Sequence, residues 1–358
     1  MAYTTINKST DNFRIKLYAG NASNRSITFD ESTNMQPDLV WIKSRTNAEW
    51  HHLVDVVRGT TSNIYSNATN AADTDNDRVT AFGTNGFSLG VDDGVNNASE
   101  NFVAWNWKAG GAGSSNTDGN NITSTVSVNT TSGFSIVKYT GTGSASDTIG
   151  HGLGVKPDMV IMRPLGYSGA WWIVHKNNNA DHILEFNTNG QANISSFGGG
   201  GLRYSTFTTS VIGGANGSSN SDLWNKSGEN YIAYCFAGKT GYSKFGSYTG
   251  NGNADGPFIY TGFKPAFVLI KNKSSSSTNW QMYDNKREGY NPQNDLFRAN
   301  LADAEGNGTD PIDIYSNGFK NRHTASSQNT SGDNYIYMAI AEEPLVANVG
   351  SSIPATAR

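Results

Sequence analysis

Four short sequence landmarks recur in the same order three times along this chain of 358 residues. The first is a tyrosine that ends an alternating apolar stretch and is followed two residues later by glycine, at Tyr18, Tyr139 and Tyr248. The second is a proline that opens an apolar run ending in a basic residue, and it follows each tyrosine by 19, 18 and 17 residues. The three prolines are Pro37, Pro157 and Pro265. Self-similarity of this kind predicts a repeated structural unit.

The third and fourth landmarks complete the repeated pattern. The third is a tryptophan-led segment followed by a base, at residues 50–58, 171–176 and 280–286. The fourth is an acidic residue and an asparagine before an aromatic strand, at residues 100–104, 229–233 and 333–337. A proline at the first position of a strand costs no ladder hydrogen bond, and a near-continuous apolar run suits a strand buried on both faces. The landmarks are aromatic and apolar rather than Gly/Ser filler, so we predict three copies of one module.

The composition indicates strands rather than helices. Hydrophobic residues make up 36% of the chain and charged residues only 16%, with 40 glycines. The polar remainder of Asn, Ser and Thr competes with helical backbone hydrogen bonds, whereas the aromatic 11% suits strands. We therefore predict an all-β chain of three tandem antiparallel β-sandwich modules of jelly-roll or lectin-like type. Two alternatives stay open: the modules share sheets, or they close into a three-fold arrangement.

The landmarks and the polar stretches between them set the predicted domain boundaries. We expect an N-terminal arm at 1–12, a first β-module at 13–110, a linker at 111–131, a second module at 132–239, a third at 242–343 and a C-terminal tail at 344–358. The first linker is rich in Gly, Ser, Asn and Thr, as flexible connections are.

Several protein classes are disfavoured by the sequence. Cys235 is the only cysteine, so no disulfide forms within the chain. The first residues contain no apolar core typical of a signal peptide, and no apolar run approaches the roughly 18 residues of a membrane span. The net charge of −4 disfavours nucleic-acid binding. We expect neither membrane insertion nor a nucleic-acid partner.

No metal or cofactor motif is complete. Residues 73–77 resemble the start of a calcium loop, but the sixth position is Arg78 and the twelfth is Thr84, where glycine and glutamate are required. An irregular surface Ca²⁺ site is the alternative that stays open. His51 and His52 are adjacent and face opposite sides of a strand, so one metal does not easily take both. We predict no metal-binding and no cofactor-binding residues.

The repeated acids do not form a catalytic pair. Asp55 and Asp284 hold matching positions in the first and third copies, and His175 replaces them in the second. An acid next to a base at a strand end is more often a local ion pair, and carboxylates from separate modules do not act together as a glycosidase pair. We expect no enzymatic activity and no catalytic residues.

The tryptophans are the best ligand candidates. Trp50, Trp171 and Trp280 are expected to pack between sheets, as large aromatic residues usually do, with an exposed platform for sugar rings as the alternative. Tyr167 and Trp172 lie outside the repeated pattern and are better placed for the surface. The candidate glycan-binding residues are Tyr167, Trp171 and Trp172.

The quoted motifs resemble a known family. The Tyr-x-Gly turn, the segment at residues 37–43 and the Glu/Asp-Asn-Phe/Tyr closure look like a repeated domain of unknown function in virion proteins of marine bacteriophages, often tail fibre or structural proteins. The resemblance extends over residues 13–343 and carries no catalytic residues. It implies a place on the exterior of a phage particle, on the tail or capsid, with other virion proteins as partners and a homotrimer as the favoured assembly.

Three functions compete on these grounds. The first is a tail fibre or receptor-binding protein that adheres to a host-surface glycan or an outer-membrane receptor, with ligands bound by variable loops on a rigid β-scaffold. The second is a purely structural part, such as a capsid decoration or head fibre. The third is a polysaccharide depolymerase, ranked last because no pair of carboxylates emerges. Position in the particle separates the first two, and polysaccharide cleavage identifies the third.

Overall fold

The computed structural model describes residues 4–178, 182–193, 201–214, 222–306 and 310–344. These ranges form an all-β protein, as predicted, whose α-helices are two short ones of four residues each, α1 (Asp93–Asn96) and α2 (Asp222–Asn225). Short 3-10 turns occur at Ser9–Asp11 and Tyr204–Thr206. None of the described helices is long and apolar enough to cross a membrane.

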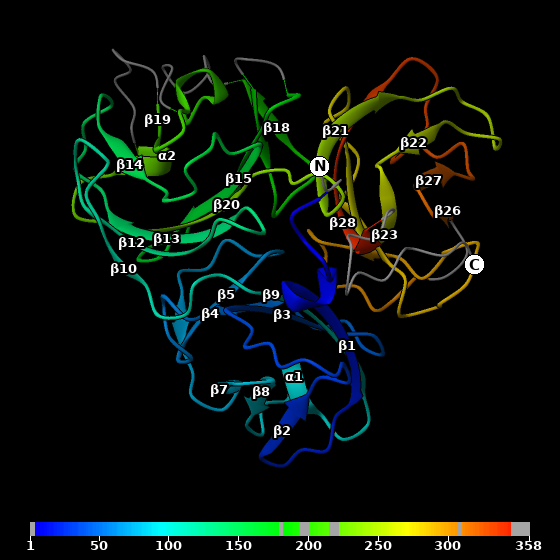
Figure 1. The fold of residues 1–358 in the computed structure, drawn as a ribbon, viewed down its shortest axis with the longest axis horizontal. Coiled ribbons are helices and arrows are strands. Elements are labelled where there is room, and N and C mark those ends of the chain that lie inside the picture. The colour runs from blue at the N-terminus through cyan, green and yellow to red at the C-terminus, as the bar shows by residue number, and fades with distance from the viewer. Residues whose placement is uncertain (1–3, 179–181, 194–200, 215–221, 307–309, 345–358) are drawn as a thin grey trace.

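Three large sheets surround the centre of the molecule (Figure 1). In spatial order, the first contains β1 (Phe13–Ala19), β9 (Asn101–Trp107), β3 (Leu39–Ser44), β4 (His52–Asp55), β5 (Ser62–Tyr65) and β6 (Asp73–Thr74). The second contains β10 (Ser114–Asn116), β12 (Ser124–Asn129), β13 (Phe134–Thr140), β20 (Asn230–Phe236), β15 (Met159–Pro164), β16 (Trp172–His175), β17 (His182–Glu185) and β18 (Gln191–Asn193). The third contains β21 (Ser243–Thr249), β28 (Asn334–Pro344), β23 (Phe263–Asn272), β24 (Gln281–Asp284) and β25 (Phe297–Arg298).

Three small sheets lie farther from the centre, one beside each large sheet (Figure 1). The first contains β2 (Arg25–Thr28), β8 (Gly86–Leu89) and β7 (Val79–Gly83). The second contains β11 (Asn121–Ile122), β14 (Thr148–Gly150) and β19 (Val211–Gly213), and the third contains β22 (Phe258–Tyr260), β27 (Gly318–Asn321) and β26 (Ile312–Tyr315). The described strand pairs are antiparallel except β11 and β14. The segment predicted as a linker, 111–131, supplies β10, β11 and β12 and so extends the second pair of sheets.

The repeated tyrosines make the same contacts in all three large sheets. Tyr18, Tyr139 and Tyr248 each stack on the aromatic residue opposite them in the neighbouring strand, with ring centroids 5.2, 5.3 and 5.0 Å apart. Each hydroxyl donates to a backbone carbonyl shortly before that strand, at 2.8, 2.5 and 2.8 Å. A buried phenol with a partner for its hydroxyl combines apolar area with a satisfied polar tip. The first and fourth landmarks are therefore two halves of one contact.

The glycine after each tyrosine is required by close backbone packing. A Cβ atom at Gly20, Gly141 or Gly250 would lie 2.0, 2.3 or 2.2 Å from a backbone carbonyl oxygen of the segment before the last strand. None of the three has a positive φ, so backbone freedom is not what requires glycine at these positions. Only a residue without a side chain allows the two backbones to approach this closely.

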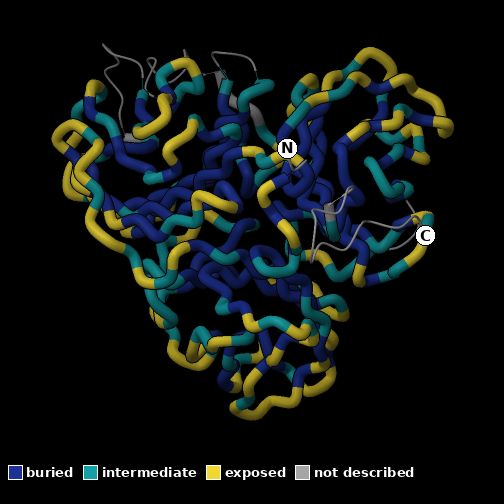
Figure 2. The backbone as a smooth tube through the Cα atoms, in the orientation of Figure 1, coloured by how far each residue is buried: buried dark blue, intermediate teal, exposed yellow. Residues whose placement is uncertain are grey.

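The proline-led strands are buried on both faces, as their apolar runs predict. In β3, Leu39 and Trp41 face the centre of the molecule, whereas Val40 and Ile42 pack under the small sheet. β15 and β23 alternate in the same way, with Met159, Ile161, Phe267 and Leu269 facing the centre. Figure 2 shows the consequence, a buried interior with exposed backbone at the periphery.

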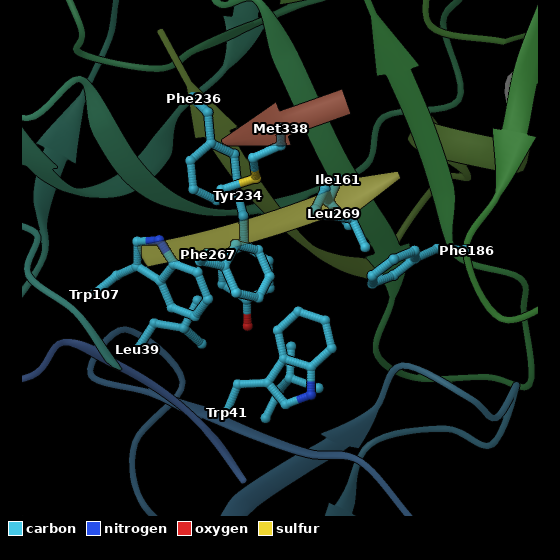
Figure 3. Close-up of a pocket in the computed structure, with 11 residues that line it drawn as sticks. Leu39, Trp41, Trp107, Ile161, Phe186, Tyr234, Phe236, Phe267, Leu269 and Met338 are labelled. Carbon is cyan, nitrogen blue, oxygen red and sulfur yellow. The ribbon is translucent and has the colours of Figure 1, made fainter. Parts of the chain in front are cut away.

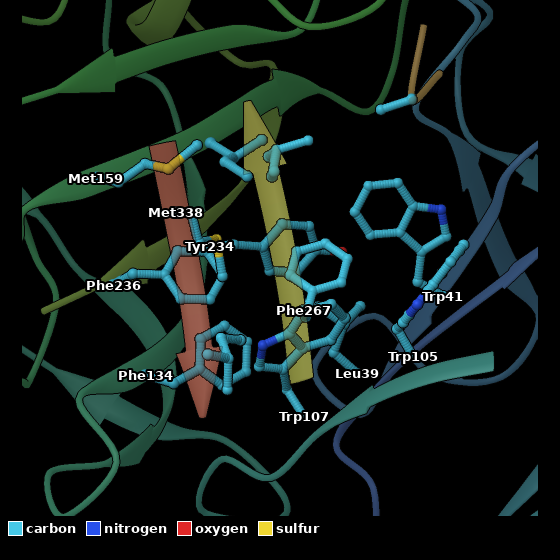
Figure 4. Packing of buried hydrophobic residues seen from close by; sticks show 14 of the residues in the cluster. Leu39, Trp41, Trp105, Trp107, Phe134, Met159, Tyr234, Phe236, Phe267 and Met338 are labelled. Carbon is cyan, nitrogen blue, oxygen red and sulfur yellow. The ribbon is translucent and has the colours of Figure 1, made fainter. Parts of the chain in front are cut away.

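The largest apolar cluster combines the inner faces of all three large sheets (Figure 4). Aromatic pairs join each sheet to the next: Phe13 with Phe267 at 5.9 Å, Trp41 with Phe186 at 5.8 Å, and Phe236 with Phe245 at 6.0 Å between ring centroids. Burial of apolar surface is the main force that stabilises such an arrangement. The sheets therefore share a core, while the domain boundaries stay a prediction.

The basic residue that ends each proline-led apolar run is buried and contacts a different part of the chain. The Arg163 guanidinium donates to backbone carbonyls of residues 68–70 of the first part of the chain, and Lys271 Nζ donates to the Asn189 carbonyl of the second part at 2.9 Å. Lys43 Nζ lies 5.3 Å from the ring centroid of Phe297 in the third part. Burial lowers the pKa of Lys43 and of Lys271 to about 8. The three contacts therefore follow a cyclic order: the second part contacts the first, the third contacts the second, and the first contacts the third.

An aspartate follows the first two of the repeated prolines and holds the chain where it leaves the sheet. Asp38 Oδ2 accepts hydrogen bonds from the backbone N–H groups of Ala109 and Gly111 at 2.7 and 3.1 Å, and Asp158 Oδ2 accepts one from Gly238 at 2.8 Å. The third part has Ala266 at this position, and there β28 continues along β23 as far as Pro344. Aspartate is thus present in the first and second parts, where the chain leaves the large sheet and continues into the following part.

Candidate functional site

The predicted glycan-binding tryptophans are buried. Trp171 has no exposed surface and its indole Nε1 donates to the Tyr65 carbonyl at 2.6 Å, while Trp172 is 7% exposed and packs under the second small sheet. Neither presents a ring face to a sugar, so the idea of an exposed platform at these two residues is wrong. The reason is that both faces of the strand are covered. Tyr167 is half-buried, with its hydroxyl 3.1 Å from that of Tyr231, and its role in binding stays a prediction.

The tryptophan landmark is displaced by one residue in the first part of the chain. The backbone N–H groups of His51, Trp171 and Trp280 each donate to an asparagine side chain, at 2.9, 2.6 and 2.9 Å, so these three residues correspond. The prediction of burial is confirmed for Trp171 and Trp280 but wrong for Trp50, which is 41% exposed and lies against Tyr65. Burial also lowers the pKa of His51 well below its ordinary value.

The repeated acids form local ion pairs, as predicted, and these pairs are buried; the base that pairs with Asp284 is Arg287 rather than Lys286. Asp55 pairs with Arg58 and Asp284 with Arg287, each at 2.6 Å, and all four charged side chains are at most 1% exposed. Both carboxylates also accept a hydrogen bond from a neighbouring sheet, Asp55 from Tyr234 Oη at 2.8 Å and Asp284 from Trp105 Nε1 at 3.0 Å. These acids hold the sheets together rather than face solvent.

The acidic loop that resembles a calcium site is occupied by a guanidinium group. Arg78 lies 2.9 Å from Asp73, 3.2 Å from Asp75 and 3.2 Å from Asp92. In the part of the chain that the structure describes, no group of three or more His, Cys, Asp or Glu side chains is placed to hold a metal ion.

The cavity at the meeting point of the three large sheets is a packing gap (Figure 3). Its volume is about 20 Å³, room for about one water molecule, and its lining is apolar. The residues around it are Leu39, Trp41, Leu53, Trp107, Ile161, Phe186, Tyr234, Phe236, Phe267, Leu269 and Met338. An organic ligand does not fit there.

Exposed aromatic side chains gather on the outer face of the third small sheet. Along β22, Phe258 and Tyr260 are 46% and 52% exposed, while Ile259 between them is buried. Tyr315 of β26 lies 5.8 Å from Phe258 between ring centroids. Around them, Lys320 pairs with Asp255 at 2.5 Å and Arg322 with Asp313 at 3.3 Å. We call Phe258, Tyr260 and Tyr315 the aromatic face.

An open pocket of about 340 Å³ adjoins the aromatic face at Tyr260. Lys176, Lys239 and Lys244 line it together with Asp158, which pairs with Lys176 at 3.2 Å. Lys244 Nζ donates to the Tyr260 carbonyl at 2.7 Å and lies 5.2 Å from the ring centroid. Burial and, after it, the charge of Lys176 lower the pKa of Lys244. This lysine pocket contains three cations and one anion, so it favours a negatively charged ligand.

Sequence reasoning missed the aromatic face, although a signal was present. The alternation of Phe258, Ile259 and Tyr260 is typical of a strand with one buried and one exposed face. Its position after the Tyr-x-Gly landmark corresponds to residues 26–28, where serine and threonine flank an isoleucine. Two aromatic residues at solvent-facing strand positions mark a binding surface more clearly than the tryptophans within the repeat.

The fold and this face define a class: an all-β protein with a shared aromatic core, an exposed aromatic surface and an adjoining basic pocket. The chain belongs to the family described as Domain of unknown function (DUF7483), whose model matches residues 8–344 as one unit. No curated protein and no solved structure matches the chain. The expectation of a domain of unknown function is thus confirmed, and the link to bacteriophage virions stays a prediction.

Proposed function

We propose that this chain is a non-enzymatic adhesion protein that binds an acidic host-surface glycan through the aromatic face and the lysine pocket. Its place would be the exterior of a bacteriophage particle, as a tail fibre or receptor-binding component. The observation that carries the binding proposal is Tyr260, an exposed aromatic residue that borders a pocket with three lysines. The virion location rests on the sequence resemblance.

The chemistry of the two surfaces is complementary to an acidic sugar. Aromatic rings offer rigid apolar area to the C–H face of a sugar ring, at low cost in side-chain entropy. Ammonium groups of Lys176, Lys239 and Lys244 provide charge-assisted hydrogen bonds to a carboxylate, sulfate or phosphate substituent. Thr240 and Thr261, which also line the pocket, add hydroxyl groups that either donate or accept.

The absence of catalysis is part of the proposal. Hydrolytic depolymerases usually place two carboxylates against the substrate, and Asp55 and Asp284 are instead buried in ion pairs with arginine. This supports adhesion over cleavage. Incubation of the purified chain with an acidic polysaccharide should leave its size distribution unchanged in chromatography, and shortened chains would contradict the proposal.

We also propose that the three pairs of sheets are three copies of one β-sandwich module, in tandem. The shared strand order, the three stacked tyrosine pairs and the matching close contacts of Gly20, Gly141 and Gly250 support this. A homotrimer of the whole chain remains our favoured assembly on the particle, and light scattering of the purified chain tests it.

Binding is tested with the full chain and a panel of immobilised acidic and neutral polysaccharides. We expect saturable binding to an acidic member, weakened about ten-fold in Tyr260→Thr, a loss of ~1.4 kcal/mol. Threonine is the residue at the corresponding position of β2, so the variant keeps a side chain that this fold accepts. Thr28→Ala on β2 is the matched control and should bind normally. Equal binding by Tyr260→Thr and the unchanged chain would contradict the proposed site.

A further inference from the structure

A second, smaller pocket lies beside the loop that joins β24 to β25. Its volume is about 10 Å³, which is room for a single oxygen atom with its hydrogens. The lining residues include Lys264, Asn285, Tyr290, Asn291, Gln293 and Ile314. None of them lines the lysine pocket or belongs to the aromatic face. Tyr290 borders the opening and is 64% exposed.

Asn285 is the unusual member of this pocket. It is only 5% exposed, and both polar atoms of its side-chain amide are buried without a hydrogen-bond partner. Gln293, 4% exposed, has an equally unpartnered Oε1. A buried polar group that lacks a partner destabilises a protein by ~1–3 kcal/mol, so three such atoms around one pocket indicate an absent partner.

The other polar groups of the pocket are already satisfied. Asn291 exchanges two hydrogen bonds with the backbone of Ile314, at 2.8 and 2.9 Å. Gln293 Nε2 donates to the Tyr290 carbonyl at 2.7 Å, and Lys264 Nζ pairs with Glu342 at 2.5 Å. The unpartnered Asn285 amide and Gln293 carbonyl oxygen therefore offer one donor and two acceptors to the same small space.

The corresponding position elsewhere in the chain carries no amide. The backbone N–H groups of Val56, Lys176 and Asn285 donate to the residue that follows each repeated proline, at 2.9, 2.8 and 2.9 Å, so the three positions correspond. Valine in the first part shows that the fold does not need a polar side chain here. The amide of Asn285 consequently has a role that packing does not supply.

We infer that this pocket binds one hydroxyl group of a neutral sugar whose ring lies against Tyr290. The hydroxyl accepts a hydrogen bond from Asn285 Nδ2 and donates one to Gln293 Oε1, which satisfies two of the three unpartnered atoms with one group. Apolar C–H groups of the sugar cover the exposed phenol ring. The inference rests on the proposed function only for the ligand class, because its residues are separate from those of the aromatic face.

The test uses the full chain and saturation-transfer NMR titrations with glucose, galactose, mannose and N-acetylglucosamine. We expect at least one of them to bind saturably, and Asn285→Val to weaken that binding at least ten-fold. The same variant should raise the thermal midpoint in the absence of sugar, because an unpartnered amide is removed. Tyr290→Ala, at an exposed position, should also weaken binding while leaving the thermal midpoint unchanged.

Two results would overturn the inference. One is the absence of saturable binding for all four sugars, which would make the pocket a site for an internal water only. The other is unchanged sugar affinity in both Asn285→Val and Tyr290→Ala. Tyr260→Thr separates this inference from the proposed function: it should lose acidic-polysaccharide binding but keep neutral-sugar binding. Each proposal can therefore fail while the other stands.

Discussion

The first and third parts of the molecule agree at the positions that face another sheet and differ where a strand faces solvent. In both small sheets an isoleucine pairs with a phenylalanine on the inner side, Ile27 with Phe87 and Ile259 with Phe319. On the outer side, Ser26 and Thr28 of the first correspond to Phe258 and Tyr260 of the third. Packing restrains the inner side chains, whereas the outer ones are free to take part in recognition.

The first and third parts share a buried ion pair, and its loss should have the largest effect on the free energy of unfolding. We expect Asp55→Asn and Asp284→Asn each to lower the free energy of unfolding by ~3–5 kcal/mol, because a buried arginine loses its counter-charge. Chemical denaturation of both variants measures this. A loss below ~1 kcal/mol in one of them would show that the two pairs are not equivalent despite their equal geometry.

The second part of the chain sharpens this comparison, because it has a histidine instead. His175 pairs with Met159 in the same register in which Asp55 pairs with Leu39, and burial lowers its pKa from 6.5 to about 3. The hydrogen bond to the Tyr337 carbonyl raises this pKa, and the charges of Lys176 and Lys273 lower it further. Between these two pH values the unfolded chain binds a proton that the folded chain does not, so stability falls as the pH decreases below 6.5.

We therefore expect His175→Gln to reduce the decrease of the thermal midpoint between pH 6.5 and pH 4. Burial also lowers the pKa of His52 and His151, to about 3 and about 4, and these two residues should account for part of the remaining decrease. Calorimetric scans at a series of pH values measure the slope. An identical slope in the variant and the unchanged chain would contradict a neutral, buried His175.

The smallest effect is expected on the outer face of the third small sheet. Phe258→Ser introduces the side chain of the corresponding Ser26, and the free energy of unfolding should change by less than ~0.5 kcal/mol, as is usual at exposed positions. Ser26→Phe is the reverse exchange and should be equally neutral. A loss above ~2 kcal/mol in Phe258→Ser would mean that the aromatic face serves packing and would remove its assigned role in binding.

Part of the candidate site could be read from the sequence, and part could not. The acid–base pairs at the strand ends were predictable because each acid lies close to a base in the chain, whereas their burial was not. The difference in exposure between Trp50 and Trp171 could not be predicted. His51, not Trp50, holds the position that corresponds to Trp171, so Trp50 lies one residue too early in the chain. Trp171 follows the strand register into the core, whereas Trp50 lies outside it. A displacement of one residue reverses the direction of a side chain on a strand.

The sequence by itself determined that the chain is all-β, where its main strands lie and that the proline-led strands are covered on both faces, because apolar periodicity and turn residues act over short distances. Only the tertiary structure decided what covers those faces. The inner faces of three sheets, formed by three successive parts of the chain, meet in one core, and this brings Lys176 to the same pocket as Lys244 and Tyr260. Such contacts depend on the packing of distant segments, which no local pattern records.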